Sequence, residues 1–183
     1  MIPSSPVPLE KENYRGVKLP VSYATTGAFR VAVDATEDAA SFRMTLTPFD
    51  EPRLKEYEME LYPPYFGNVE AYGIFDGEIL AGCVEIAEET WSRRLRITEL
   101  WVEEHRRLRG LGGTLLEFAK MKAVEKGCRL AILETQTCNL AAIALYRKHG
   151  FTFIGLDTTC YTDADVENDE VRVEMGWKTG VAG

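Results

Sequence analysis

The segment from Arg96 to Glu117 constrains the fold more than any other part of this 183-residue chain. Its first part, Arg96 to Glu103, has the residue pattern of a strand, and three glycines follow within Gly110 to Gly113. Glycines let a backbone turn sharply and approach a ligand closely, while the next helix directs unpaired N–H groups and its positive dipole end at that ligand. The segment therefore predicts a strand, a turn and a helix start that binds an anion such as pyrophosphate.

Glycine-rich turns between a strand and a helix also occur where they serve close packing alone, so both interpretations are open on this pattern. The spacing differs from the G-x-G-x-x-G of a dinucleotide site. The G-x-x-x-x-G-K-[ST] phosphate loop does not occur anywhere in the sequence. Nicotinamide and nucleoside triphosphate binding are therefore disfavoured.

The composition indicates one soluble globular domain, with 45% hydrophobic and 27% charged residues. No run approaches the roughly 18 apolar residues that a membrane span needs. The start, Met1 to Pro8, lacks the basic and apolar regions of a secretion signal, so we expect a cytoplasmic protein without a membrane partner. The net charge of −8 argues against a nucleic-acid partner and favours a cationic substrate.

The cysteines show neither a C-x-x-C pair nor a histidine at metal spacing, so we expect free thiols and no metal. They are Cys83, Cys128, Cys138 and Cys160. A nucleophilic Cys138 activated by His105 or His149 is disfavoured, because nothing in the sequence orients such a base.

The first half of the chain predicts an arm followed by an antiparallel meander. Prolines within residues 1–27 indicate an extended, loosely attached arm, which leaves 28–183 as the domain. Phe42 to Phe49 alternates as a strand, and Asp50 caps a predicted helix from Glu51 to Leu61. Asp76-Gly77 between two strand-like runs predicts a hairpin.

The second half predicts a strand, helix, strand unit after the meander. The expected elements are a strand Leu95–Glu103, a helix Gly110–Lys126 stopped by Gly127, a strand Arg129–Thr135, a helix Leu140–His149, and strands Phe151–Tyr161 and Val171–Trp177.

Arg107 to Gly112 at the predicted helix start and a later block from Leu130 to Phe151 carry a resemblance. Together they resemble the GNAT N-acetyltransferase superfamily, whose acetyl-coenzyme A motif is [QR]-x-x-G-x-[GA] at a helix start. Arg107 to Gly112 matches that motif. The second block follows in the same order, with Leu130–Gln136, Asn139, Ala142, Tyr146 and Gly150-Phe151. Details of this block, with Glu134, Asp157 and Tyr161, are similar to the streptothricin acetyltransferase branch, which acetylates an amine of an aminoglycoside-like antibiotic.

The resemblance implies an α+β fold with a mixed, mostly antiparallel central sheet of six to seven strands. It further implies helices on both faces and a splayed strand pair that holds acetyl-coenzyme A. The acceptor would be a cationic small-molecule amine. Another small amine, an amino acid or a peptide N-terminus stays open, as does a noncatalytic acetyl-coenzyme A module. The oligomeric state, a homodimer included, is also open.

The resemblance also implies site residues. Tyr146 would protonate the departing sulfur, and Glu99, directly or through water, would accept the amine proton. Cofactor contacts are expected from Leu100, Trp101, Val102, Arg107, Leu108, Arg109, Gly110, Leu111, Gly112, Gly113, Thr114, Asn139, Ala142 and Tyr146. Substrate contacts are expected from Glu99, Glu134, Asp157 and Tyr161.

Simpler interpretations exist for several of these residues. Asn139 is a good helix N-cap, and an aromatic such as Tyr146 on a helix commonly belongs to a core. Glu99 in a strand faces either solvent or a cleft. The acidic segment Asp157–Glu174 is either a wall that attracts a cationic substrate or a solvated loop.

Overall fold

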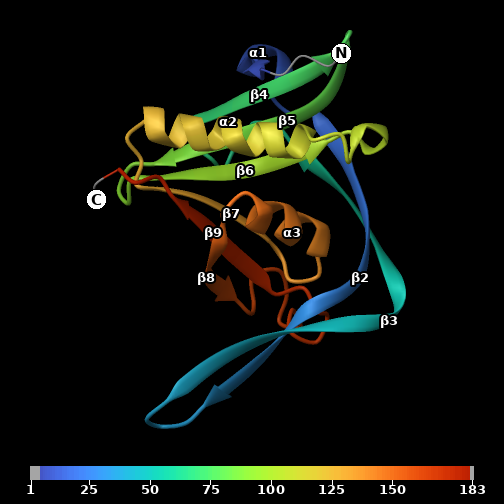
Figure 1. Ribbon diagram of the computed structural model, residues 1–183, viewed down its shortest axis with the longest axis vertical. Coiled ribbons are helices and arrows are strands. Elements are labelled where there is room, and N and C mark those ends of the chain that lie inside the picture. Colours follow the sequence, from blue (N-terminus) through green and yellow to red (C-terminus); the bar gives the residue numbers. More distant parts are fainter. Residues whose placement is uncertain (1–4, 182–183) are drawn as a thin grey trace.

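The computed structural model describes residues 5–181 and is centred on a seven-stranded sheet of strand order β1-β4-β5-β6-β7-β9-β8 (Figure 1). The strands are β1 (Val7–Pro8), β4 (Val69–Asp76), β5 (Ile79–Glu89), β6 (Arg94–Val102), β7 (Leu130–Gln136), β8 (Thr152–Asp157) and β9 (Arg172–Lys178). Neighbours pair antiparallel except β6 and β7, which are parallel. This confirms the mixed, mostly antiparallel sheet.

The parallel strands β6 and β7 part soon after they begin. Arg94–Arg96 pairs with Leu130–Ile132, whereas the strands run on to Val102 and Gln136. Beyond the paired residues, both strands line one cavity. Their facing backbone N–H and C=O groups are available to a ligand there, because such groups need partners that the opposite strand no longer supplies. The expected splayed strand pair is confirmed.

A β-bulge in β6 decides which side chains face that opening. Glu99 pairs with Glu85 and Ile97 with Ile86, so Thr98 is an extra residue in β6. An extra residue shifts the alternation of side chains by one position. On one face of the sheet, the core contains Leu95, Ile97, Leu100 and Val102. The side chains of Thr98, Glu99 and Trp101 lie on the opposite face.

The two longer helices, α2 (Leu111–Glu125) and α3 (Leu140–Lys148), pack into the same core on one face of the sheet (Figure 1). Gly110 caps the start of α2 with a positive φ of 86°, and Gly127 follows its end with φ 66°. Asn139 caps α3, since its side-chain oxygen accepts from the backbone N–H of Ala142 at 3.2 Å. Both predicted helices and the N-cap role of Asn139 are confirmed.

The other face is covered by the short helix α1 (Lys11–Tyr14) and by one end of a two-stranded ribbon, β2 (Lys18–Ala35) and β3 (Ala40–Glu60). The helices on the two faces are thus very unequal in length. The second core consists of Leu9, Leu19, Met59, Leu61, Tyr62, Ala71, Cys83 and Trp101. The far end of the ribbon reaches away from the sheet (Figure 1).

The predicted helix from Glu51 to Leu61 is wrong, because these residues up to Glu60 belong to β3 and pair with β2. Locally the segment suits a helix, with Pro52 in a first turn. However, pairing with β2 places Met59 and Leu61 in the second core, where both are buried. The free energy gained from this burial outweighs the helix propensity of the segment.

The loosely attached arm is also wrong for residues 5–27, while residues 1–4 lie outside the described part. Leu9 is 1% exposed and Leu19 is 8% exposed. β2 runs from Lys18 to Ala35 without a break, so a boundary at residue 27 falls inside a strand. Pro8 lies in β1 and Pro20 lies in β2 of the ribbon, and an edge strand tolerates proline where no ladder bond is needed from its N–H.

The predicted hairpin is confirmed between β4 and β5, with its turn one residue later than expected. Asp76 pairs with Ile79, so the loop is Gly77-Glu78. Gly77 has φ 63°, which suits the first loop position of a type II′ turn. Among residues 5–181, the longest helices remain too short and too polar to cross a membrane.

Candidate active site

A cavity of about 900 Å³, the main cavity, opens where β6 and β7 part. Its walls come from the ribbon, from β6 and β7, from the turn before α2 and from α3. It gathers most of the predicted site residues: Glu99, Leu100, Trp101, Val102, Arg107, Leu108, Gly110, Leu111, Gly112, Gly113, Glu134, Asn139, Ala142, Tyr146 and Tyr161.

Three predicted site residues do not line this cavity. Arg109 is exposed beside the turn. Thr114 lies within the first turn of α2, where its N–H and hydroxyl both donate to the Gly110 carbonyl, at 3.0 and 3.3 Å. Asp157 accepts from the N–H of Thr159 at 3.0 Å and closes a turn after β8. Arg109, Thr114 and Asp157 are therefore not part of the cavity wall.

The start of α2 supports an anion site and also shows why two of its glycines are needed for packing. The N–H groups of Leu111 to Gly113 lack carbonyl partners one turn earlier in a helix, and these residues face the main cavity. A Cβ on Gly112 would lie 3.0 Å from Cδ2 of Leu145, and one on Gly113 would lie 2.8 Å from Nε2 of His149. The anion and packing interpretations thus hold together.

Arg107 joins the turn to the ribbon. Its Nε donates to the carbonyl of Val102 at 3.2 Å, and its Nη1 donates to the carbonyl of Ser22. The guanidinium therefore already uses part of its hydrogen-bonding capacity on the protein backbone. It lies in the cavity wall as a fixed positive charge rather than as a free surface arginine.

Tyr146 belongs to both the core and the cavity. The residue is 8% exposed, and its ring lies 6.3 Å from that of Phe151. Burial raises the pKa of its hydroxyl, with Tyr57 and the Glu99 carboxylate adding to the effect, so the group holds its proton. Burial and neighbouring charges act on that hydroxyl, and no hydrogen bond to it is formed within residues 5–181. It is a proton donor without an assigned acceptor.

Glu99 reaches the same cavity because of the bulge in β6. Burial raises its pKa to about 8, and the carboxylates of Glu85 and Glu134 add to the increase. A carboxyl group whose pKa lies near the working pH is well matched to accept and release a proton. Of the carboxyl groups in the cavity wall, Glu99 therefore has the environment most suited to acid–base chemistry.

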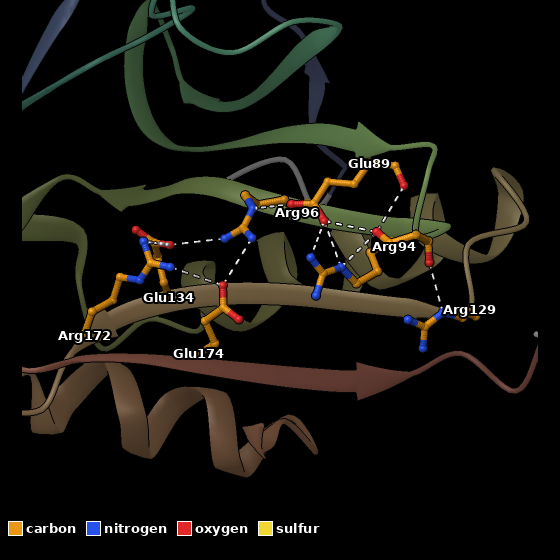
Figure 2. A network of polar contacts seen from close by, with 8 residues as sticks. Glu89, Arg94, Arg96, Arg129, Glu134, Arg172 and Glu174 are labelled. Carbon is orange, nitrogen blue, oxygen red and sulfur yellow. Dashed lines mark hydrogen bonds and ion pairs between the residues drawn. The ribbon is translucent and has the colours of Figure 1, made fainter. Parts of the chain in front are cut away.

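Glu134 has a different environment, because two arginines hold it (Figure 2). Arg96 Nη1 and Arg172 Nη1 lie 3.1 and 3.4 Å from Glu134 Oε2. The same two guanidinium groups also reach Glu174, and Arg96 further pairs with Glu89. The charge of Glu134 is thus largely offset within the protein.

The family of the chain follows from a sequence comparison. A model of the acetyltransferase (GNAT) family matches residues 36–151, which is more than half of the chain. The chain belongs to the GNAT acetyltransferase family. The solved structure of nourseothricin acetyltransferase superposes with a TM-score of 0.69 at 29% identity, covering 91% of this chain and 89% of the other.

This GNAT-family chain spans about half to three fifths of the length of two streptothricin acetyltransferases that it matches. It is 34% identical to the streptothricin acetyltransferase of Escherichia coli over 109 residues, or 60% of this chain and 62% of that one. It is 35% identical to the streptothricin acetyltransferase of Streptomyces lavendulae over 94 residues, or 51% and 49%. A Bacillus anthracis protein solved with acetyl coenzyme A shares the fold at 23% identity, with a TM-score of 0.69 over 95% of this chain and 96% of that one.

In this member of the GNAT family, the ribbon contributes a polar wall that the sequence analysis missed. The Tyr23 hydroxyl donates to Gln136 Oε1 at 3.1 Å, Gln136 Nε2 donates to Glu170 Oε2 at 3.1 Å, and Lys55 Nζ donates to Glu170. Tyr57 lies in the same wall. The missed signal was the strict alternation of large and acidic residues along Lys55–Leu61, which is typical of a strand.

The acidic segment Asp157–Glu174 is mainly structural. Asp165 accepts from the N–H groups of Tyr161 and Thr162, both at 2.8 Å, and Asp169 accepts from Arg30 and Arg53 at 3.1 and 3.2 Å. Among its acidic residues, Glu170 alone lines the main cavity in the described chain. The segment is therefore not the continuous acidic substrate wall considered as an alternative.

Proposed function

We propose that this protein transfers an acetyl group from acetyl-coenzyme A to an amine of a streptothricin-type antibiotic. The observation that carries the proposal is one cavity between splayed strands that unites an anion-binding helix start with Glu99 and Tyr146. Membership of the GNAT family and the names of the relatives support the acetyl donor and the acceptor class.

The residues present fit acetyl-coenzyme A, which supplies the acetyl group as a thioester. Leu111 to Gly113 present backbone N–H groups for a pyrophosphate at the helix start. Leu100 to Val102 line the splay, where β6 has lost its pairing with β7, so its backbone is free to bond an extended ligand and to donate an N–H to a carbonyl oxygen. Asn139 and Ala142 lie on the facing side of the cavity, from the start of α3.

Glu99 and Tyr146 are proposed to handle the two protons of the reaction. An amine with a pKa of about 10 reaches the site as an ammonium and must lose a proton before it can attack a carbonyl. Glu99 would take that proton, directly or through water. Tyr146 holds a proton that it can donate to the sulfur that leaves.

The acceptor wall has carboxylates and aromatic side chains that suit a cation. Glu99 places a carboxyl group in it, and Glu170 adds a carboxylate that already pairs with Lys55. Tyr57 and Tyr161 add aromatic rings, whose faces attract cations. Because Glu134 is paired with two arginines, we expect it to shape the wall rather than to bind an ammonium by itself.

The test is an acetylation assay with streptothricin, lysine, spermidine, an aminoglycoside and a short peptide, each compared by kcat/KM. We expect a clear preference for streptothricin. Equal rates on all amines would contradict the acceptor class while leaving the acetyltransferase activity in place. Binding of acetyl-coenzyme A by calorimetry without turnover of any amine would contradict the enzymatic activity itself.

A further inference from the structure

We infer that Glu85 is a positioning residue that keeps Glu99 protonated in the empty site. A bound ammonium acceptor, or a higher pH, releases that proton to water and leaves Glu99 as the carboxylate that can accept the amine proton. Glu85 does not line the main cavity, so it would act only through its neighbour. The inference about the carboxylate pair stands on geometry, and only its consequence for acetylation rests on the proposed function.

Glu85 and Glu99 face each other across two neighbouring strands. They are partners in the antiparallel register of β5 and β6, at the place where the bulge inserts Thr98. Side chains of such partners lie on the same side of a sheet, a few ångströms apart at their Cβ atoms. The bulge therefore aims Glu99 toward the side that Glu85 already occupies.

Glu85 is 0% exposed, and donors occupy both of its carboxylate oxygens. The backbone N–H of Tyr62 donates to Oε2 at 2.6 Å, and the hydroxyl of Thr98 donates to Oε1 at 2.8 Å. A backbone N–H can only donate, so it favours negative charge on the oxygen that it meets. Burial raises the pKa of Glu85, whereas these two bonds oppose that increase.

Among the described residues, no lysine or arginine forms a salt bridge with either carboxyl group of the pair. Within residues 5–181, Glu85 forms no salt bridge. A second negative charge directly opposite would be strongly unfavourable in a buried place, so the two carboxyl groups are expected to carry one negative charge between them. The bonds from Tyr62 and Thr98 assign that charge to Glu85, which leaves the proton on Glu99.

Other groups also face Glu99, but their charges are offset or absent. They are Cys83 of β5, Glu134 of β7, Tyr57 of β3, Tyr146 of α3 and Tyr65 of the segment before β4. Burial raises the pKa of the thiol and of each tyrosine, so these remain neutral. Arg96 and Arg172 offset Glu134. Glu85 is thus the one uncompensated negative neighbour among the described residues.

The experiment measures the pKa of Glu99 itself, by 13C NMR of protein labelled at the glutamate side-chain carboxyl carbons. The Glu99→Gln variant assigns the signal. Glu85→Gln should lower the pKa of Glu99 by about one unit or more, because the opposing charge is gone. The acid limb of kcat/KM against pH should move to lower pH by the same amount.

Two further variants separate this role from a structural one. Glu134→Gln is the matched control, since it also removes a carboxylate near Glu99 but one whose charge is offset, and its effect should be smaller. Thr98→Val removes the hydroxyl that stabilises charge on Glu85, so it should move the pKa of Glu99 in the same direction, and Thr98→Ser should restore it. If Glu85→Gln does not fold, the pKa of Glu99 in Thr98→Val still tests the inference.

An unchanged or raised pKa of Glu99 in both Glu85→Gln and Thr98→Val would overturn the inference. So would a uniform loss of kcat at every pH with no shift of the NMR titration, which indicates a purely structural residue. A shifted NMR titration in a protein that acetylates no amine would support the carboxylate pair and contradict the proposed function.

Discussion

At the scale of single residues, three glutamates that face the same region of the molecule have three different environments. Glu85 is buried and bonded by two neutral donors, Glu134 is held by two arginines, and Glu99 has neither. All three residues are glutamates, so the side chains around each one decide whether its carboxyl group can exchange a proton. The same holds for Tyr146, whose burial keeps its hydroxyl protonated.

Replacing Tyr146 with Phe tests its role as a proton donor. We expect kcat to fall by roughly 10²- to 10⁴-fold, the range for a single general acid, with acetyl-coenzyme A affinity nearly unchanged. The fold should persist because only an unbonded hydroxyl is lost. Steady-state kinetics and calorimetry check this, with Tyr72→Phe as a control because that hydroxyl bonds Glu70 away from the cavity. Unchanged turnover would return Tyr146 to a purely structural role.

Replacing Glu99 with Gln tests its raised pKa through stability. The folded state, with a pKa of about 8, binds more protons than the unfolded state, whose carboxyl has its ordinary value of 4.5. Stability from this group is therefore present below that ordinary value and is lost as the pH rises toward 8. Relative to wild type, Glu99→Gln should gain stability across this window in urea unfolding. The surface control Glu167→Gln should show no such gain of stability. A stability difference between Glu99→Gln and wild type that does not change with pH would contradict the raised pKa.

At the scale of elements, the site depends on how closely α2 approaches α3. Gly112 and Gly113 leave no room for a Cβ beside Leu145 and His149. His149 Nδ1 in turn lies 2.7 Å from Glu117 Oε1 on α2. The glycines that permit an anion site therefore also set the distance between two helices of the cavity wall.

Replacing Gly113 with Ala tests this packing. The new Cβ would lie 2.8 Å from Nε2 of His149, so we expect a loss of about 1–3 kcal/mol of stability, the usual cost of overpacking. Adding His149→Ala should recover most of it, as measured by thermal unfolding. If the double variant is no more stable than Gly113→Ala, the contact with His149 is not the cause.

The ribbon is the second element on which the site depends, and Asp169 holds it to the body through Arg30 and Arg53. Asp169 has φ 62°, a conformation that Asn tolerates, so Asp169→Asn removes charge without backbone strain. We expect a loss of about 1.5–3 kcal/mol, the value of hydrogen bonds to charged groups, and a raised KM for the acceptor alone. The exposed Asp163→Asn is the control, and equal effects of the two variants would contradict the prediction.

At the scale of the whole molecule, the net charge of −8 acts over distances longer than any contact in the cavity. It would attract the polycationic acceptor and repel the anionic acetyl donor of the proposed function. The positive groups proposed to receive that donor would therefore act locally, at the helix start and at Arg107.

Salt should separate these two effects. We expect kcat/KM for a polycationic acceptor to fall as sodium chloride rises through about 0.15 M, where the screening length is roughly 8 Å. The KM for acetyl-coenzyme A should not rise in parallel, because screening also weakens its repulsion. Steady-state kinetics at several salt concentrations check this. A parallel rise for both substrates would indicate a general salt effect on the protein.

Patterns within a few residues were enough to predict the local features. Asn139 as a cap, Gly127 as a helix stop, and the hairpin at Gly77 follow from backbone conformations that few residues adopt. The glycine spacing and the second block also indicated the family and most of the cavity wall. These features are readable because their physical causes act between neighbours in the chain.

Only the tertiary structure decided the features that depend on distant pairing. β3 is a strand because β2 pairs with it and the second core buries Met59, so its helix-like local pattern was misleading. Glu99 faces its partner Glu85 because pairing with β5 makes Thr98 the extra residue of a bulge. Whether a carboxylate is offset, as Glu134 is by Arg96 and Arg172, depends on strands far apart in sequence. Burial and charge pairing are properties of the assembled sheet, and local sequence does not contain them.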